Sequence, residues 1–413
     1  MERNDVARDA RDASRPLASL STAMKNAVLE EIAFEIIAQT PQILEANAED
    51  MDSARTNHLE AAKLKRLELT AESLAQLALG VRQVAALPDP VGLVTDERVV
   101  PSGLRVRRVR VPLGVIMMIY EARPGVTIDA FALCFKAGNA CILKCGREAV
   151  RSNVALISIV HQVLEAHGLS RAALTFVSPR DESELKDLLH RDDCIDLVIP
   201  RGGERLIRFV AANSRIPTIQ HYKGVCHIFV DESADQVGAI EVCVNSKVSA
   251  PATCNAAECI LIHEKIAHEF LPKLENAFIA AGVEMRVHID ALPLTKHAQL
   301  AEQSDFGCEF LDMIVAIKVV PDVARAIEHI HWFGSRHTEV ILSESQESIA
   351  AFRAGVDASC VIVNASTRFN DGFQLGLGAE IGISTSKLHT YGPMGLEDLT
   401  ARRFEVDGKC QTR

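Results

Sequence analysis

The chain has 413 residues, 48% of them hydrophobic, and a formal net charge of −11 at pH 7. This length and apolar content are typical of a globular protein that buries large cores in two or three domains. The acidic balance, without a Lys/Arg cluster large enough to follow a phosphate backbone, argues against a nucleic-acid partner, and no apolar run approaches the ~18 residues of a membrane span.

Helical spacing dominates the start of the chain. Residues 5–87 are rich in Ala, Leu and Glu and predict an all-helical opening. Residues 93–110 predict a β hairpin with Pro-Ser-Gly at its turn. From Val111, short apolar runs alternate with helical segments, which is typical of parallel strands covered on both faces. These runs are GVIMMIY, ACILK, ALTFVS, IDLVIP and CHIFV, and helices are expected near 127–137, 147–166, 181–190, 202–213 and 234–247.

The same alternation begins again after Cys254 and predicts a second α/β domain. Its expected strands are ECILIH, VEMRVHI, MIVAIKVV, EVILS and CVIVN, with helices near 265–281, 322–331 and 344–352. The first α/β region fits a doubly wound nucleotide-binding layer. The hairpin and the tail after Ser386 lack a core of their own, so we expect them to pair across a subunit boundary in a homo-oligomer.

Eleven cysteines are scattered along the chain without a Cys-x-x-Cys pair. Their odd number and irregular spacing favour reduced thiols over a disulfide framework or a zinc site. Cys141 and Cys145, the closest pair, flank three residues of an expected buried strand, and we expect no metal site. The opening segment shows no apolar core with a cleavage site, so we expect a cytoplasmic protein.

Cys254 is the candidate nucleophile. In PATCNAAECILIH (251–263) it lies in a polar, turn-like stretch ahead of an apolar run. A thiol in such a place can be reached by substrate, and backbone N–H groups can stabilise its thiolate. A cysteine within the apolar run would instead be an ordinary core residue.

Two segments of the first α/β region are candidate cofactor contacts. Gly202 and Gly203 in IPRGGERLIRF open a helix after a strand, where free N–H groups favour a phosphate, although an ordinary strand-to-helix turn has the same pattern. Lys144 ends a strand and Arg147 begins the next helix. Arg147 can bind a ribose 2′-phosphate, and the alternative is that both are solvated cations.

Residues 364–398 are dense in Gly, Ser and Thr, which is typical of a loop that lines a site. Arg368 in this loop, and Arg123 in YEARPGVT, are candidates for holding a carboxylate or phosphate of the substrate. Each is alternatively a surface salt-bridge partner.

Taken together, these segments resemble the gamma-glutamyl phosphate reductases, a family within the aldehyde dehydrogenase superfamily. The resemblance spans nearly the whole chain and rests on EARPGVT, IPRGGERLI, PATCNAAECILIH and GAEIGISTSKLHTYGPMGLEDL. It implies an α/β, aldehyde dehydrogenase-like fold with two doubly wound domains and a β-hairpin oligomerisation arm. The implied divisions are a helical start of the nucleotide-binding domain (1–92), the arm (93–110), the nucleotide-binding domain (111–250), a catalytic domain (251–385) and a C-terminal oligomerisation segment (386–413).

The resemblance also implies roles for single residues. Cys254 matches the family nucleophile, Lys144 and the Gly202-Gly203 turn fall where the cofactor is held, and Glu309 falls where a glutamate holds the nicotinamide ribose. The implied reaction is NADPH-dependent reduction of L-glutamyl 5-phosphate to L-glutamate 5-semialdehyde in proline biosynthesis. In that reaction a cysteine thiolate displaces phosphate to form a thioester, which is then reduced, and glutamate 5-kinase precedes the enzyme.

One segment indicates which acceptor, phosphate or water, takes the acyl group from the cysteine. Where the superfamily usually reads ELGGK, this chain reads QHYKGVC, with His221 or Tyr222 near the place of the glutamate that activates water. The missing carboxylate favours phosphate chemistry over hydrolysis, and a neutral core histidine is the alternative role of His221. An aldehyde or acyl-CoA dehydrogenase, and a catalytically inactive scaffold, are the rival functions. The chain departs from the family pattern at Met117, Met118, Gly125, Lys144 and Arg336.

Overall fold

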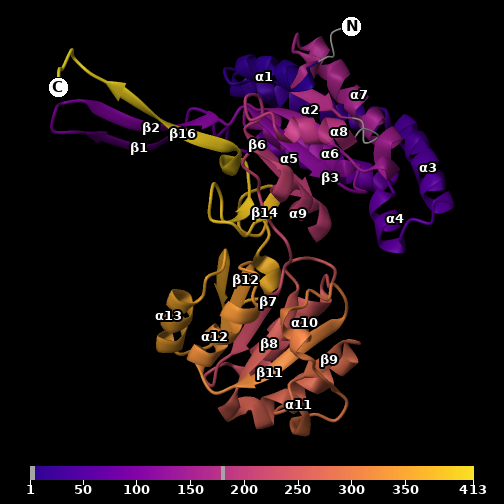
Figure 1. Ribbon diagram of the computed structural model, residues 1–413, viewed down its shortest axis with the longest axis vertical. Coiled ribbons are helices and arrows are strands. Elements are labelled where there is room, and N and C mark those ends of the chain that lie inside the picture. Colours follow the sequence, from indigo (N-terminus) through magenta and orange to yellow (C-terminus); the bar gives the residue numbers. More distant parts are fainter. Residues whose placement is uncertain (1–4, 178–181) are drawn as a thin grey trace. The chain divides into compact units, whose positions relative to one another are not determined.

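The structure, a computed structural model, describes residues 5–177 and 182–413 and divides into two compact units (Figure 1). The first unit takes the chain up to residue 220, together with 377–382 and 394–413. The second unit takes 221–376 and 383–393. Ser178 of the expected strand ALTFVS, and Asp181 at the start of an expected helix, lie outside the described residues.

A four-stranded parallel sheet in the order β5-β4-β3-β6 forms the centre of the first unit. Its strands are β3 (Val115–Tyr120), β4 (Ala140–Lys144), β5 (Leu174–Phe176) and β6 (Leu197–Arg201). Every residue of β3 and β4 is buried, so these runs carry no polar alternation. They pack in one continuous hydrophobic core with the surrounding helices.

Helices of the first unit begin where the sequence predicts an all-helical opening. Ser21 caps one of them and Thr70 caps another, each accepting a hydrogen bond from a backbone N–H three residues on. The helices are α1 (Val6–Leu17), α2 (Thr22–Ala38), α3 (Thr40–Thr56), α4 (Ala61–Leu67), α5 (Ala71–Ala86), α6 (Gly125–Lys136), α7 (Val150–Ala166), α8 (Glu182–Leu189) and α9 (Glu204–Asn213).

An antiparallel sheet of three strands in the order β1-β2-β16 forms the arm. The predicted hairpin supplies β1 (Val94–Val99) and β2 (Arg105–Pro112), and the tail supplies β16 (Thr400–Asp407). Figure 1 shows β16 alongside β2, and the register runs from Thr400 opposite Pro112 to Asp407 opposite Arg105. The expectation that hairpin and tail pair across a subunit boundary is therefore wrong for these strands, because the pairing occurs within one chain.

The second unit is built on a seven-stranded parallel sheet in the order β10-β9-β11-β8-β7-β12-β13. Its strands are β7 (Cys226–Val230), β8 (Ala257–His263), β9 (Glu284–Val287), β10 (Gln299–Leu300), β11 (Ile314–Val320), β12 (Thr338–Leu342) and β13 (Cys360–Val363). Its helices are α10 (Gln236–Val248), α11 (Glu264–Ala280), α12 (Val323–Phe333) and α13 (Gln346–Gly355).

Alternate residues of the central strands face two separate cores. Ile228 and Ile260 pack with residues of α10 and α11, whereas Phe229 and Leu261 pack with residues of α12 and α13. Both faces are thus covered, which confirms the doubly wound arrangement predicted from the uninterrupted apolar runs.

The strand CHIFV, β7, is the main correction to the sequence prediction. We placed it in the first α/β region, but it pairs with β8 and β12 in the sheet of the second unit. The boundary between compact units accordingly lies between Gln220 and His221 rather than at residue 250. A short, fully buried strand has no local feature that says which sheet it joins, so only the tertiary pairing decides.

The remaining elements are short. A two-stranded sheet pairs β14 (Gly382–Ser384) with β15 (Gly392–Met394). None of the described helices has both the length and the apolar character that a membrane span needs. The 3₁₀ helices are η1 (Arg147–Ala149), η2 (Arg171–Ala173), η3 (Leu292–Leu294), η4 (Gln303–Gly307), η5 (Thr367–Phe369) and η6 (Glu397–Leu399).

Candidate active site

Cys254 lies in a tight turn between the end of α10 and the start of β8. The turn is closed by backbone hydrogen bonds from Thr253 N to Ala250 O at 3.3 Å and from Ala256 N to Thr253 O at 3.0 Å. Cys254 is half-buried, whereas Cys226 and Cys259 on the adjoining strands are fully buried. The structure therefore gives the predicted nucleophile the partial exposure that a reactive thiol needs.

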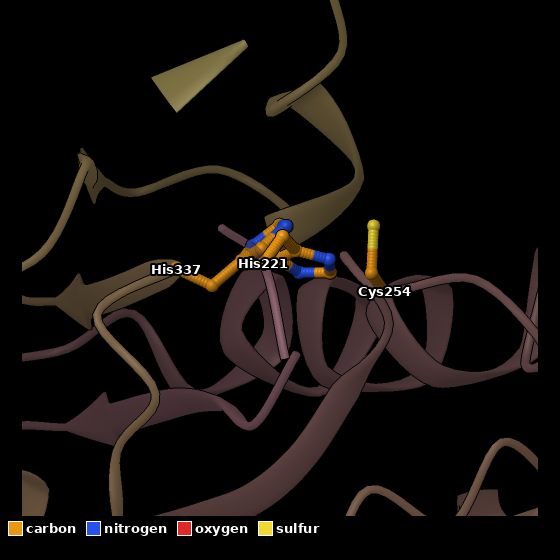
Figure 2. Close-up of side chains that lie close together, drawn as sticks. All are labelled: His221, Cys254 and His337. Atoms are coloured by element: carbon orange, nitrogen blue, oxygen red, sulfur yellow. The ribbon is translucent and has the colours of Figure 1, made fainter. Parts of the chain in front are cut away.

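Strand order brings two histidines to this turn. Strands β8, β7 and β12 are neighbours in a parallel sheet, so the residues that precede them gather at one edge. Cys254 comes three residues before β8, and His337 comes immediately before β12. His221 joins them, and a nitrogen or sulfur atom of each of the three side chains lies within 4.8 Å of the others (Figure 2). The two imidazole rings are 5.1 Å apart between centroids.

Burial sets the charge of the groups next to the thiol. It lowers the pKa of His337 well below its usual range, and His221 beside it adds to this effect. His337 is therefore a neutral imidazole that accepts or donates hydrogen bonds, and its Nδ1 lies 2.7 Å from Thr338 Oγ1. Burial also raises the pKa of Cys226 well above its usual range, so its thiol stays protonated and donates to Cys254 O at 3.2 Å.

Gly224 lies directly against the nucleophile. A Cβ at this position would be 2.8 Å from the Cα of Cys254 and closer still to its carbonyl oxygen, so only glycine fits without displacement. The backbone N–H of Gly224 donates to Glu309 Oε1 at 2.8 Å, and Lys223 Nζ donates to Gly307 O at 2.7 Å. The segment that ends in Gly224 thus connects the cysteine turn to Glu309.

Arg368, in the glycine-rich loop, is hydrogen-bonded to the same turn. Its Nη1 donates to Thr253 Oγ1 at 2.8 Å, next to Cys254. Asn255 Nδ2 donates to Asn370 O at 3.0 Å, which makes a second link between turn and loop. Nε of Arg368 is buried, and no hydrogen-bond partner for it lies within the described part of the chain. The guanidinium therefore has unused capacity to bind an anion near Cys254.

In the first unit, the expected cofactor residues lie at one edge of the sheet. Lys144 is the last residue of β4 and is 6% exposed, whereas Arg147 begins η1 and is exposed. Gly202 and Gly203 follow β6, and Arg123 follows β3. These strands are neighbours and parallel, so their carboxyl ends meet at the edge where doubly wound sheets bind nucleotides.

The glycine turn at this edge has an acidic neighbour. Gly203 is the N-cap of α9, and its N–H donates to Glu121 Oε2 at 3.4 Å. A Cβ on Gly203 would meet open space, so the turn leaves room beside it. Glu121 already uses one N–H of the turn, and Lys144 and Arg147 are among the side chains at this edge that offer a phosphate positive charge.

The sequence therefore predicts most, but not all, of the residues around Cys254 and at the carboxyl edge of the first sheet. The second unit holds Cys254, His221, Glu309 and Arg368 around one turn. The sequence prediction does not include His337, Gly224, Thr253 or Glu121. The first two precede strands of the sheet by only one or two residues, and that position is the signal that would have found them.

Comparison with known proteins identifies the class to which this fold and site belong. Residues 2–307 match the model of the aldehyde dehydrogenase family. The chain belongs to this family of oxidoreductases, which uses nicotinamide cofactors.

More similar relatives place the chain within that family. A gamma-glutamyl phosphate reductase from Desulforapulum autotrophicum is 49% identical over 409 residues, covering 99% of this chain and 98% of its own. Another from Xylella fastidiosa is 50% identical over 408 residues, covering 99% and 98%. The crystal structure of the gamma-glutamyl phosphate reductase of Thermotoga maritima superposes with a TM-score of 0.97 at 40% identity, covering 99% of each chain. The chain is a member of the gamma-glutamyl phosphate reductases.

Proposed function

We propose that this enzyme reduces L-glutamyl 5-phosphate to L-glutamate 5-semialdehyde with NADPH and releases phosphate, in proline biosynthesis. The names of the relatives, at 49–50% identity over nearly the whole chain, support the substrate. The observation that carries the reaction type is the surroundings of Cys254. In the described chain, two imidazoles, those of His221 and His337, each have a nitrogen within 4.8 Å of its Sγ, and the segment QHYKGVC lacks the glutamate that activates water in the superfamily.

Acyl transfer to the thiol needs little help from a base at the attacked carbon, because phosphate is a good leaving group. The Cys254 thiolate adds to the 5-carbonyl carbon, and the C–O bond to phosphate breaks with its electron pair, leaving a thioester. His221, which has a ring nitrogen within 4.8 Å of the thiol, is the proposed acceptor of the thiol proton. The backbone N–H of Cys254 stabilises the developing oxyanion.

Lys144, Arg147, the Gly202-Gly203 turn and Glu309 are the residues we expect to hold NADPH. The fit rests on two cations and an open glycine turn at the carboxyl edge of the first sheet. When bound, the cofactor supplies the hydride that converts the thioester to the aldehyde and restores the thiol. The segment QHYKGVC, with His221 or Tyr222 near the place of the glutamate that activates water, favours that reduction over hydrolysis.

Arg368 and Arg123 are the proposed anion-binding residues. Arg368 is supported by its hydrogen bond to Thr253 beside the nucleophile and by its buried Nε, which has no hydrogen-bond partner among the described residues; both suit a phosphate or carboxylate of the substrate. Arg123 is supported only by its place at the end of β3.

An acceptor assay in the reverse direction tests the proposal. Enzyme supplied with L-glutamate 5-semialdehyde and NADP⁺ is expected to form reduced cofactor only when inorganic phosphate is present. Parallel reactions with coenzyme A, or with neither acceptor, separate the two rival activities. Reduction that proceeds without phosphate would identify a hydrolytic aldehyde dehydrogenase, and reduction that needs coenzyme A would identify an acyl-CoA dehydrogenase.

Arg147→Glu tests the choice of cofactor. A charge-assisted contact with the 2′-phosphate contributes about 1.5–3 kcal/mol, or roughly 10- to 100-fold at 1.4 kcal/mol per decade. We expect kcat/KM for NADPH to fall by that factor while kcat/KM for NADH changes far less. The matched control is Arg171→Glu, the same charge change before β5 at the opposite edge of the same sheet. Equal losses with both cofactors, or none with either, would show that Arg147 does not bind the 2′-phosphate.

The enzyme is also proposed to work in the cytoplasm as a homo-oligomer, alongside the glutamate 5-kinase that makes its substrate. The arm supports an oligomer because β1 and β16 are its two edges and carry exposed apolar side chains, with Val99 72% and Phe404 58% exposed. Light scattering is expected to give a mass well above that of one chain. A fully active monomer would contradict this.

A further inference from the structure

Two histidines and a cysteine, side chains of the types that ligate metals, lie together in the core of the second unit, and the proposed reaction does not use them. His227 on β7, Cys259 on β8 and His329 on α12 each place a nitrogen or sulfur atom within 4.8 Å of the others. All three side chains are buried, with exposed fractions of 0%, 0% and 4%. Such a set is unusual in a core, where polar groups normally find hydrogen-bond partners.

Strand register builds this group. His227 is paired with Cys259 across β7 and β8, and Glu339 is paired with His227 across β12 and β7. Paired residues of neighbouring strands project from the same face, so the three form one row. His329 lies next to the row from α12, with its Nε2 3.8 Å from Cys259 Sγ and its ring centroid 5.6 Å from that of His227.

Glu339 fixes the orientation of the His227 ring. Its Oε2 lies 3.0 Å from His227 Nδ1 and also accepts from the His227 backbone N–H at 3.0 Å. Nδ1 therefore carries a proton toward Glu339, and Nε2 is the ring nitrogen on the side away from that carboxylate. Nε2 of His227 is buried without a hydrogen-bond partner anywhere in the described chain, and the nitrogen of His329 that faces Cys259 is Nε2. A histidine that donates one ring N–H to a carboxylate and offers the other nitrogen is the usual arrangement at metal sites.

We propose that His227, Cys259 and His329 bind one divalent transition-metal ion, with Zn²⁺ the best match to two imidazoles and a thiolate. The charges balance in the core, because the thiolate of Cys259 and the carboxylate of Glu339 together neutralise a divalent cation. Three protein ligands leave a fourth position for water. A cavity of about 360 Å³ has His329 in its lining, together with Glu328 and Trp332 among others, so one ligand of the group borders that cavity.

The bound ion would join β7, β8 and α12. It is a structural site, since Cys259 and its partners face the core rather than the substrate. Its effect is expected on stability: an ion that binds only the folded chain raises the midpoint of thermal unfolding. Zn²⁺ added to chelator-treated enzyme should therefore raise that midpoint.

Metal content and the spectrum of the cobalt form test the site directly. Tag-free enzyme, treated with a chelator and dialysed, is expected to take up one Zn²⁺ per chain by elemental analysis. Reconstitution with Co²⁺ should produce the near-ultraviolet charge-transfer band of a thiolate–cobalt bond. A protein that takes up no ion, or a cobalt form without this band, would overturn the proposal and leave the group as a hydrogen-bonded core cluster.

Variants locate the site. Cys259→Ala is expected to lose the charge-transfer band, and Cys243→Ala, which removes another fully buried thiol of the same unit, is the matched control that keeps it. Cys254→Ser should also keep it, which separates this site from the thiol and two imidazoles of the candidate active site. Glu339→Gln should weaken Co²⁺ binding by about 10- to 100-fold. If Cys259→Ala does not fold, His329→Gln is measured instead, and it should weaken Co²⁺ binding because it removes one imidazole ligand. A band that survives Cys259→Ala, Co²⁺ binding that His329→Gln leaves unchanged, or a band that disappears only with Cys254→Ser contradicts the assignment.

Discussion

Replacing Cys254 with alanine is expected to abolish turnover in a protein that still folds. The side chain is half-buried at a turn and is not part of a hydrophobic core cluster, so its loss leaves no cavity in the packed interior. Cys226 Sγ is hydrogen-bonded to the carbonyl of Cys254 and burial raises its pKa, so it supplies no thiolate in its place. We expect kcat/KM to fall by at least about four orders of magnitude, the scale of losing a covalent nucleophile.

Cys360→Ala is the matched control for that experiment. Cys360 is also half-buried and begins β13 of the same sheet, but it lies outside the group around Cys254. It should retain normal rates, and circular dichroism should show both variants folded. A Cys254→Ala protein within about tenfold of the normal rate would remove the basis for a thioester intermediate.

The residues next to Cys254 were enough to predict it as the nucleophile. Its neighbour His337 could not be predicted, because that contact depends on the order of the strands in the sheet. A thiol in a polar turn ahead of an apolar run is visible in thirteen consecutive residues. His337 lies far along the chain, and its only sequence signal is its place immediately before an expected strand. Its proximity to Cys254 follows from β12 and β8 flanking β7, an order that hydrophobic periodicity does not contain.

The proposed metal ligands could not be predicted from the sequence for a related reason. His227, Cys259 and His329 belong to two strands and a helix, so they have none of the short ligand spacings that mark zinc sites in sequences. The sequence therefore predicts no metal. The misassignment of β7 has the same origin, because its pairing with β8 and β12 both sets the domain boundary and creates the row of Glu339, His227 and Cys259.

Gly224→Ala is expected to lower kcat/KM by about 100-fold with little change in the fold. An added Cβ would lie 2.8 Å from the Cα of Cys254, whereas carbon atoms pack at about 3.5–4.0 Å. The two backbone segments must therefore separate by about 1 Å, and a displacement of that size at a reacting group costs about 100-fold in rate. The same shift moves the N–H that Gly224 donates to Glu309, so the two functional residues lose their common support.

Gly80→Ala separates this steric effect from the general cost of replacing glycine. Gly80 lies within α5, and a Cβ there would meet nothing within 4 Å, so alanine should leave the rate unchanged and stabilise the helix by about 0.5–1 kcal/mol. Alkylation of Cys254 by iodoacetamide adds a readout that does not depend on the cofactor. If the nucleophile has moved, its rate of alkylation in Gly224→Ala will differ from that in the parent enzyme, while Gly80→Ala will match the parent. Suppose that Gly224→Ala shows both normal turnover and normal alkylation. The turn carrying Cys254 would then accommodate the added Cβ without a change in the reactivity of the thiol, and Gly224 would not position the nucleophile.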